Sequence, residues 1–404
     1  IAPSSTDTID FTATSGQLTV NTPFTIAGID FTNWTGTLTM SAILTSSGNV
    51  KLVSGMTIAG ASGLTVSTTA TLTSNGKTWP NNLTFSGTSQ TYTLADNWTV
   101  SGTVTFAGAT AQTINGSTLI CNGNLTSTSP SLYVTGTTNI SMQGTSTIVG
   151  ANGGYALNID INTAGTISIT GTMYWKSGTF SYTAGTLSAG TSTINHFSAG
   201  SFVLSLGAQT AYNVSLISTS ALGTTLNCSG TLTLSSTILN TYAINCSGNL
   251  TMTGASSGSS TITMTGTGTW SGGYPVKNNL TIKSTAIIDI VGSVQFNTGT
   301  FIVEAGAQVN ASNSNLTVAN NATTTFDISN IKLNNFSLGG ISTVNTLVLN
   351  SPLYITGTAY LGASSQAQTI NGSPIYIESG TLSSQTGNGG VILGTSQIIM
   401  TGDK

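Results

Sequence analysis

The feature of this sequence that most restricts its fold is a glycine-centred motif that returns at long, nearly regular intervals. It occurs in stretches such as WTGTLTM, LNCSGTLTL and LYITGTAYL. Successive glycines are separated by 66, 69, 59, 62 and 65 residues, which defines a repeat of about 64 residues. We assign the following glycines to turns of the repeat: Gly36, Gly102, Gly171, Gly230, Gly292 and Gly357. Such a long period is the sequence signature of a stacked repeat architecture.

A second motif, Asn-apolar-(Thr, Ser or Asp)-apolar, precedes the last five of these glycines. It begins at the following residues: Asn82, Asn158, Asn213, Asn279 and Asn335. A third motif often follows, as in CNGNLT, CSGNLT and ESGTLS, and AQTINGS occurs identically at 111–117 and 367–373. Each long repeat therefore contains about three strand–turn segments of roughly 20 residues.

Within each short segment the side chains alternate between apolar and polar. In Thr231–Leu239, for example, Leu232 and Leu234 fall on one side of an extended chain, and the intervening threonines fall on the other. An alternation with period two is a strand signal, and Gly and Asn favour turns. No stretch of the chain carries the 3.6-residue period of a helix. The pattern predicts an all-β protein.

A strand–turn segment of roughly 20 residues cannot bury a core alone, so successive segments must stack and share one. The sequence therefore predicts a parallel β-helix, or β-solenoid, with roughly 20-residue coils. The alternative is a series of tandem small β-sandwich domains, although such domains typically need about 100 residues. We expect residues 1–18 to form an N-terminal lead-in or cap, 19–400 a continuous solenoid, and 401–404 a tail.

The three cysteines lie two residues before a motif glycine, in a slot that elsewhere holds Val or Ile. A free cysteine behaves as a small buried hydrophobe, so we predict that this slot faces the core. The predicted core slot comprises Val100, Cys121, Ile169, Cys228, Cys246, Ile290 and Ile355. A disulfide between Cys228 and Cys246 remains open, because stacked coils would place them within bonding reach.

Composition excludes several functions. Charged residues make up 4% of the chain, against roughly 25% in ordinary globular proteins, and the basic residues are seven lysines without any arginine. Nucleic-acid binding requires clustered cations, so we expect none. No uninterrupted apolar run approaches the roughly 20 residues of a membrane span, so we expect no membrane insertion.

Catalysis by a carboxylate pair is also disfavoured. Glu304 and Glu378 occupy the same motif but lie 74 residues apart, several coils away from each other, and Asp289 and Glu304 fall on different faces. Carbohydrate cleavage usually requires two carboxyl groups about 5–9.5 Å apart. A single histidine, His196, and three buried cysteines make a poor ligand set for zinc. We therefore expect no enzyme activity and no cofactor.

Aromatic residues recur just before the Asn motif, at Trp79, Tyr155, Tyr212 and Tyr274. The favoured interpretation is structural, with each ring closing the end of a sheet or packing on the next coil. The alternative is that the rings are exposed and stack on sugars, which makes these four residues candidate glycan contacts.

Several stretches, including NVSL…LNCSGTLTL and LNTYAINCSGNLTMTG, resemble the repetitive β-helical regions of known surface proteins. These are the virion appendage and decoration proteins of tailed phages and the secreted adhesins of bacteria. The resemblance covers about Thr19 to Met400. It implies a non-enzymatic structural protein, a rigid shaft or decoration of an extracellular phage appendage, with a role in surface attachment.

The resemblance also implies partners and a location. Expected partners are other copies of the chain, other appendage subunits and cell-surface glycans, and the expected location is a virion surface or a bacterial cell surface. Two alternatives stay open. One is a bacterial adhesin or matrix fibre, and the other is a carbohydrate-binding or carbohydrate-cleaving β-helix.

Overall fold

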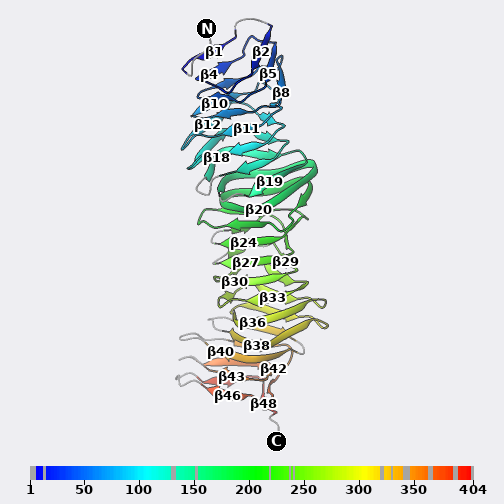
Figure 1. Cartoon of the computed structure of the whole chain (residues 1–404). Helices are drawn as coiled ribbons and strands as arrows, with labels where there is room; N and C mark the ends of the chain where they lie inside the picture. Colours follow the sequence, from blue (N-terminus) through cyan, green and yellow to red (C-terminus); the bar gives the residue numbers. More distant parts are fainter. Residues whose placement is uncertain are drawn as a thin grey trace. The chain divides into compact units, whose positions relative to one another are not determined.

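The described residues of the computed structural model form a parallel β-solenoid of about 17 turns, with about 21 residues per turn (Figure 1). The structure describes residues 6–11, 15–128, 133–150, 153–217, 220–235, 238–239, 242–318, 323–328, 331–339, 346–362, 367–384 and 390–401. Within these ranges there are strands and turns but no helix. The predicted fold is confirmed. The β-sandwich alternative is wrong, because sandwich sheets are antiparallel and the strands here pair in parallel.

The chain divides into two compact units, Ile1–Thr210 and Ala211–Lys404. In unit 1 a typical coil contains three short strands, each paired with its counterpart one coil later. One such coil and the next comprise β12 (Thr91–Leu94), β13 (Trp98–Val100), β14 (Val104–Phe106), β15 (Gln112–Gly116), β16 (Leu119–Cys121) and β17 (Leu125–Ser127). Each coil therefore adds one strand to each of three faces.

Further along unit 1 the short strands merge into longer ones. Strand β18 (Tyr133–Met142) covers two faces of its coil and is followed by β19 (Ser146–Gly150). Strand β20 (Gly154–Ser188) pairs with both and then with β21 (Thr193–His196) and β22 (Phe202–Ser205). Its residues pair with the preceding coil up to Ile161 and again from Ile167, so the ladder resumes beyond the corner between them.

Unit 2 has the same organisation, with its coils running through three rows of parallel strands. The first row comprises β26 (Leu226–Cys228), β29 (Ile244–Cys246), β32 (Thr261–Met264), β35 (Asn279–Ile282), β37 (Gly299–Val303), β39 (Thr323–Ile328), β41 (Thr346–Leu349), β44 (Gln368–Gly372) and β47 (Val391–Leu393). The second comprises β24 (Asn213–Ile217), β27 (Thr231–Ser235), β30 (Asn249–Met252), β33 (Thr267–Ser271), β36 (Ile287–Phe296), β38 (Gln308–Val318), β40 (Lys332–Leu338), β42 (Leu353–Ile355), β45 (Ile375–Ile377) and β48 (Ile398–Met400). The third includes the distal parts of β36, β38 and β40, together with β43 (Thr358–Leu361) and β46 (Thr381–Ser384).

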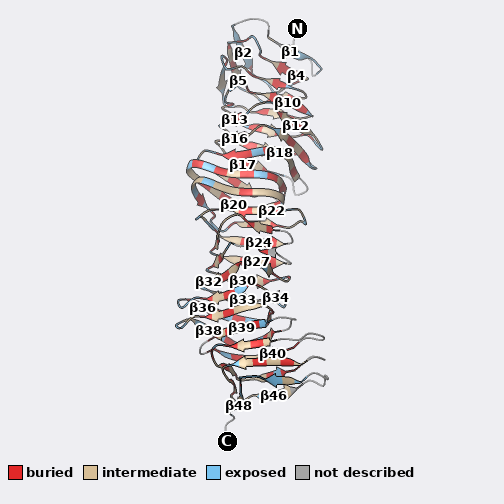
Figure 2. Cartoon of the chain, turned by 180° about the vertical axis from the view of Figure 1, so that it is seen from behind, coloured by how far each residue is buried: buried red, intermediate tan, exposed pale blue. Residues whose placement is uncertain are grey.

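The core of each unit consists of columns of apolar side chains that stack from coil to coil. Figure 2 shows buried and half-buried positions alternating along the strands, as the period-two pattern requires. In unit 1, Phe85 pairs with Phe106 in register, and their rings stack with centroids 5.2 Å apart. Burying each such side chain contributes about 1.5–3 kcal/mol, so stability accumulates with every coil.

The predicted division into lead-in, solenoid and tail stays a prediction. The structure places β1 (Thr8–Asp10) within the predicted lead-in, where it pairs in parallel with β4 (Gly28–Asp30). Residues 402–404 of the predicted tail lie outside the described residues.

Candidate functional site

The seven residues of the predicted core slot are all buried, none more than 2% exposed. Several share a column. Val100 pairs with Cys121 on the next coil, and Cys228 pairs with Cys246. The side chains at these positions pack against their equivalents above and below. The slot faces the core, as predicted from the exchange of cysteine with Val and Ile at this position of the motif.

The cysteines are free thiols in the structure. The Cys228 thiol donates to the Tyr212 carbonyl at 3.0 Å, and the Cys246 thiol donates to the Asn249 carbonyl at 3.3 Å. Burial raises the pKa of the Cys121 thiol, and contact with Cys246 together with burial raises the pKa of Cys228. A protonated, buried thiol is a poor nucleophile and a poor metal ligand.

The Asn motif is linked to a Gly-Thr step on the next coil by a hydrogen bond, which the sequence did not reveal. In each of the five Asn motifs the side-chain oxygen accepts the backbone N–H of a threonine that follows a glycine on the next coil. The five pairs are Asn82–Thr103, Asn158–Thr179, Asn213–Thr231, Asn279–Thr300 and Asn335–Thr358, at 2.7–3.0 Å. At Asn82, Asn213 and Asn335 this glycine is the repeat glycine, whereas at Asn158 and Asn279 it is Gly178 and Gly299.

Most of the repeat glycines are required because the preceding coil passes close to them, although a Cβ at Gly292 would meet nothing within 4 Å. A Cβ atom at Gly230 would collide with Oδ1 of Asn213, and one at Gly357 would meet the Asn334 carbonyl and Asn335. Gly36, Gly102, Gly230 and Gly357 lie between strands, or just before one, as predicted. Gly171 and Gly292 instead lie inside β20 and β36, with φ of +72° and +71°. At these two positions the chain adopts a positive φ within a continuous strand, a conformation that L-residues rarely adopt.

Two of the four candidate glycan contacts are buried, which corrects that interpretation for them. Trp79 and Tyr155 are each 1% exposed. The Trp79 indole N–H donates to the Asn82 carbonyl at 3.1 Å, and the Tyr155 ring packs on Trp175 with centroids 5.7 Å apart. Neither ring presents a face to a sugar. Tyr212 is half-buried, and Tyr274 is 52% exposed.

The acidic residues discussed as catalytic candidates lie on separate sheets or in ion pairs. Asp289 belongs to β36, whereas Glu304 directly follows β37 in another row. Glu304 accepts from Lys283 at 2.5 Å and from the Ser284 N–H at 3.1 Å, and these bonds hold the pKa of its carboxyl below the ordinary value. An ionised, salt-bridged carboxylate is unsuited to act as a general acid.

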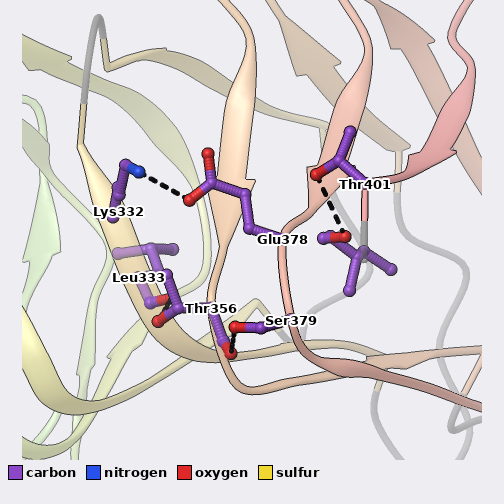
Figure 3. Close-up of polar contacts among 7 residues, drawn as sticks. Lys332, Leu333, Thr356, Glu378, Ser379 and Thr401 are labelled. Carbon is purple, nitrogen blue, oxygen red and sulfur yellow. Dashed lines mark hydrogen bonds and ion pairs between the residues drawn. The ribbon is translucent and has the colours of Figure 1, made fainter. Parts of the chain in front are cut away.

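Glu378 is held from a different coil, as Figure 3 shows. The Lys332 ammonium lies 2.6 Å from its carboxylate, although the two residues are 46 positions apart. In the same view, the hydroxyls of Thr356 and Ser379 each donate to a backbone carbonyl of the preceding coil, at 3.3 and 3.4 Å. The polar side chains at this corner connect coils to one another.

Two polar grooves lie on the outer surface of unit 1. The first, of about 410 Å³, is lined by β1, β4, β7 (Val50–Lys51) and β10 (Ala70–Thr73), and it contains the Asp30–Lys51 ion pair at 3.6 Å. The second, of about 570 Å³, lies over β16, β18 and β20 and contains Asp160. Sequence reasoning missed the second groove, although the alternation of Asn158, Asp160 and Asn162 is visible in NIDIN.

Among the described residues, no three His, Cys, Asp or Glu side chains lie close enough together to hold a metal ion. The same part of the chain contains no helix that is long and apolar enough to cross a membrane. No protein-family model, no curated protein and no solved structure matches this chain. The β-solenoid fold itself fits a structural or surface protein.

Proposed function

We propose that this chain is a non-enzymatic structural protein that forms a β-solenoid shaft or decoration of an extracellular appendage, with a role in surface attachment. The observation that carries the proposal is that polar side chains of this chain form bonds between coils. The Asn motif, hydroxyls such as Thr356 and the ion pairs of Glu304 and Glu378 all connect one coil to another. A chain organised in this way is suited to resisting deformation.

The composition supports an extracellular setting. With charged residues at 4%, the surface presents Thr, Ser and Asn hydroxyl and amide groups, and few exposed lysines are available for proteolytic cleavage. The outer polar groups are partly occupied by bonds between coils, as for Asn158 and Asn335. We propose a phage virion as the source, and a bacterial adhesin or matrix fibre is the competing assignment.

Immunogold electron microscopy of the native source, with an antibody against this chain, tests the proposal. We expect label on particles that carry heads or tails. Label on cell-surface filaments would replace the virion assignment by the adhesin assignment, and label restricted to soluble material would contradict both.

The proposed lack of catalysis has its own test. If the native source contains a polysaccharide-depolymerising activity that copurifies with this chain, the triple variant Asp289→Asn, Glu304→Gln, Glu378→Gln should retain it in full. Loss of that activity in the triple variant, with an unchanged circular dichroism spectrum, would show that the carboxylates are catalytic.

A further inference from the structure

The second groove of unit 1 is built from a regular grid of outward-facing side chains. Where β13, β16, β18 and β20 pair, Thr99, Ile120, Ser141 and Asp160 form one column in register. Asn139 and Asn158 form the adjacent column. The groove lies over these columns and has a volume of about 570 Å³.

Asp160 is positioned in this groove by hydroxyls rather than by a cation. Its Oδ1 atom accepts from the Ser181 hydroxyl at 2.6 Å and from the Thr183 hydroxyl at 3.0 Å. Its Oδ2 atom makes no hydrogen bond to any described residue, and the groove lining contains no lysine. Glu304 and Glu378, by contrast, are paired with lysines. Asp160 therefore presents a fixed, charged acceptor to the groove.

The amides beside Asp160 supply complementary donors. The Asn158 amide donates to Oδ1 of Asn139 at 3.0 Å, which leaves the Asn139 amide hydrogens directed elsewhere. Asn162 makes no side-chain hydrogen bond within the described ranges, and both Asn139 and Asn162 are exposed. Gln143 is a further amide of the lining, and it donates to the Ser141 hydroxyl at 3.2 Å. The groove thus offers donors and acceptors side by side at fixed spacing.

Ile120 contributes an accessible apolar side chain to a largely polar lining, in which the other isoleucine, Ile140, is fully buried. It is half-buried and faces outward between Thr99 and Ser141 of its column. A ligand that fills this groove must therefore hydrogen-bond as both donor and acceptor and also present a non-polar face. Binding sites commonly combine a few placed polar groups with apolar surface in this way.

We propose that this groove binds a neutral oligosaccharide. Sugar hydroxyls both donate and accept, so they suit the free Asp160 oxygen together with the Asn139 and Asn162 amides, and the C–H face of a sugar ring suits Ile120. An anionic glycan is excluded because the lining contains a carboxylate and no cation. The inference rests on the attachment role proposed above and supplies the chemical class of its ligand.

Affinity electrophoresis of the full chain in native gels that contain dextran, amylopectin or mannan tests the inference. We expect at least one of these neutral polysaccharides to retard the wild-type chain, and alginate, an anionic polysaccharide, to have no effect. The variant Asp160→Asn exchanges a charged acceptor for a neutral one and should weaken binding about tenfold. Asn162→Ala removes no internal hydrogen bond, so it should weaken binding without affecting folding.

Asp289→Asn is the matched control, because Asp289 is an exposed carboxylate on an outward face of unit 2 and accepts from Asn310 at 3.1 Å. It should bind as the wild-type chain does. The inference is overturned if none of the three neutral polysaccharides retards the wild-type chain, if only alginate does, or if Asp160→Asn and Asn162→Ala bind normally. Appendage label in the immunogold experiment combined with any of these results would remove the groove assignment and leave the structural role intact.

Discussion

Neighbouring residues of one strand have opposite roles in this protein, and β36 illustrates the difference. Ile290 faces the core and is 2% exposed, whereas Val291 is 48% exposed. Both are β-branched and equally suited to a strand, so intrinsic propensity does not distinguish them. They differ in the column of stacked side chains that each joins. Ile290 is paired in register with Trp270 of the preceding coil.

Truncation of these two residues should therefore have unequal effects. Ile290→Ala leaves a cavity in a packed column and should lower the free energy of unfolding by about 2–5 kcal/mol. Val291→Ala, the control in the same strand, should cost less than about 1 kcal/mol. Denaturant titration followed by circular dichroism measures both. Equal effects of the two substitutions would show that the side of the strand assigned to the core is wrong.

Glu304 makes stability depend on pH in a defined direction. Bonds from Lys283 and the Ser284 N–H lower the pKa of its carboxyl in the folded state below the ordinary value of 4.5. A group with a depressed folded pKa contributes stability that is present above its unfolded pKa and is lost as pH falls through the folded pKa. The contribution of Glu304 should therefore be complete at neutral pH and disappear in acid.

We expect Glu304→Gln to lower the melting temperature slightly at pH 7. The difference from the wild type should shrink as the pH falls below about 4.5 and vanish once the pH is below the lowered pKa of the folded state. Lys283→Gln should behave in the same way, because it removes the other member of the pair. Thermal melts of the three proteins between pH 7 and pH 3 provide the measurement. A difference that stays constant over this range would mean that the ion pair does not contribute.

At the level of the element, each short strand depends on the hydrogen bond between coils as much as on the alternation of its apolar and polar side chains. Asn82 lies immediately before β11 (Leu83–Phe85), and its side chain accepts the N–H of Thr103 immediately before β14. Gly102 has to be glycine because a Cβ there would collide with the backbone of Asn81. The Asn motif, the glycine and the threonine therefore form one structural unit that spans two coils.

Removal of the asparagine oxygen should lower the free energy of unfolding only when no other acceptor replaces it. Asn82→Ala leaves the Thr103 N–H without its partner and should lower the free energy of unfolding by about 0.5–1.5 kcal/mol. Asn82→Asp keeps an oxygen at the same place and should retain most of that stability. Urea titration of both variants against the wild type distinguishes them, and an Asp variant as weak as the Ala variant would argue against the bond.

Much of the element level could be predicted from the sequence, and the remainder has a physical explanation. The alternation in Thr231–Leu239 predicted strands, and the Cys228 slot predicted burial, because each depends on local pattern alone. The bond between Asn82 and Thr103 was not predicted, since it depends on the register between coils. The groove at Asp160 was missed for the same reason, because its columns come from strands that are about one coil apart in sequence.

At the scale of the whole molecule, the coil is the unit of structure. Successive coils pair in register, share one core and add strands to the same faces, so the chain should behave as a quasi-one-dimensional repeat. Removal of one complete coil should then preserve every face, whereas removal of one residue fewer should turn inward side chains outward. Tyr155, for which structural packing was the favoured interpretation and sugar stacking the alternative, belongs to this shared core and packs on Trp175.

The most direct test of this account is a pair of internal deletions in unit 2. Deletion of residues 229–246 joins Cys228 to Ser247 and removes one coil in register, because Cys228 and Cys246 are paired. Deletion of residues 229–245 removes one residue fewer and shifts the alternation. We predict that the first variant keeps the β-type circular dichroism spectrum and melts within several degrees of the wild type, and that the second loses its cooperative transition. Equal stability of the two variants, or unfolding of both, would contradict the account.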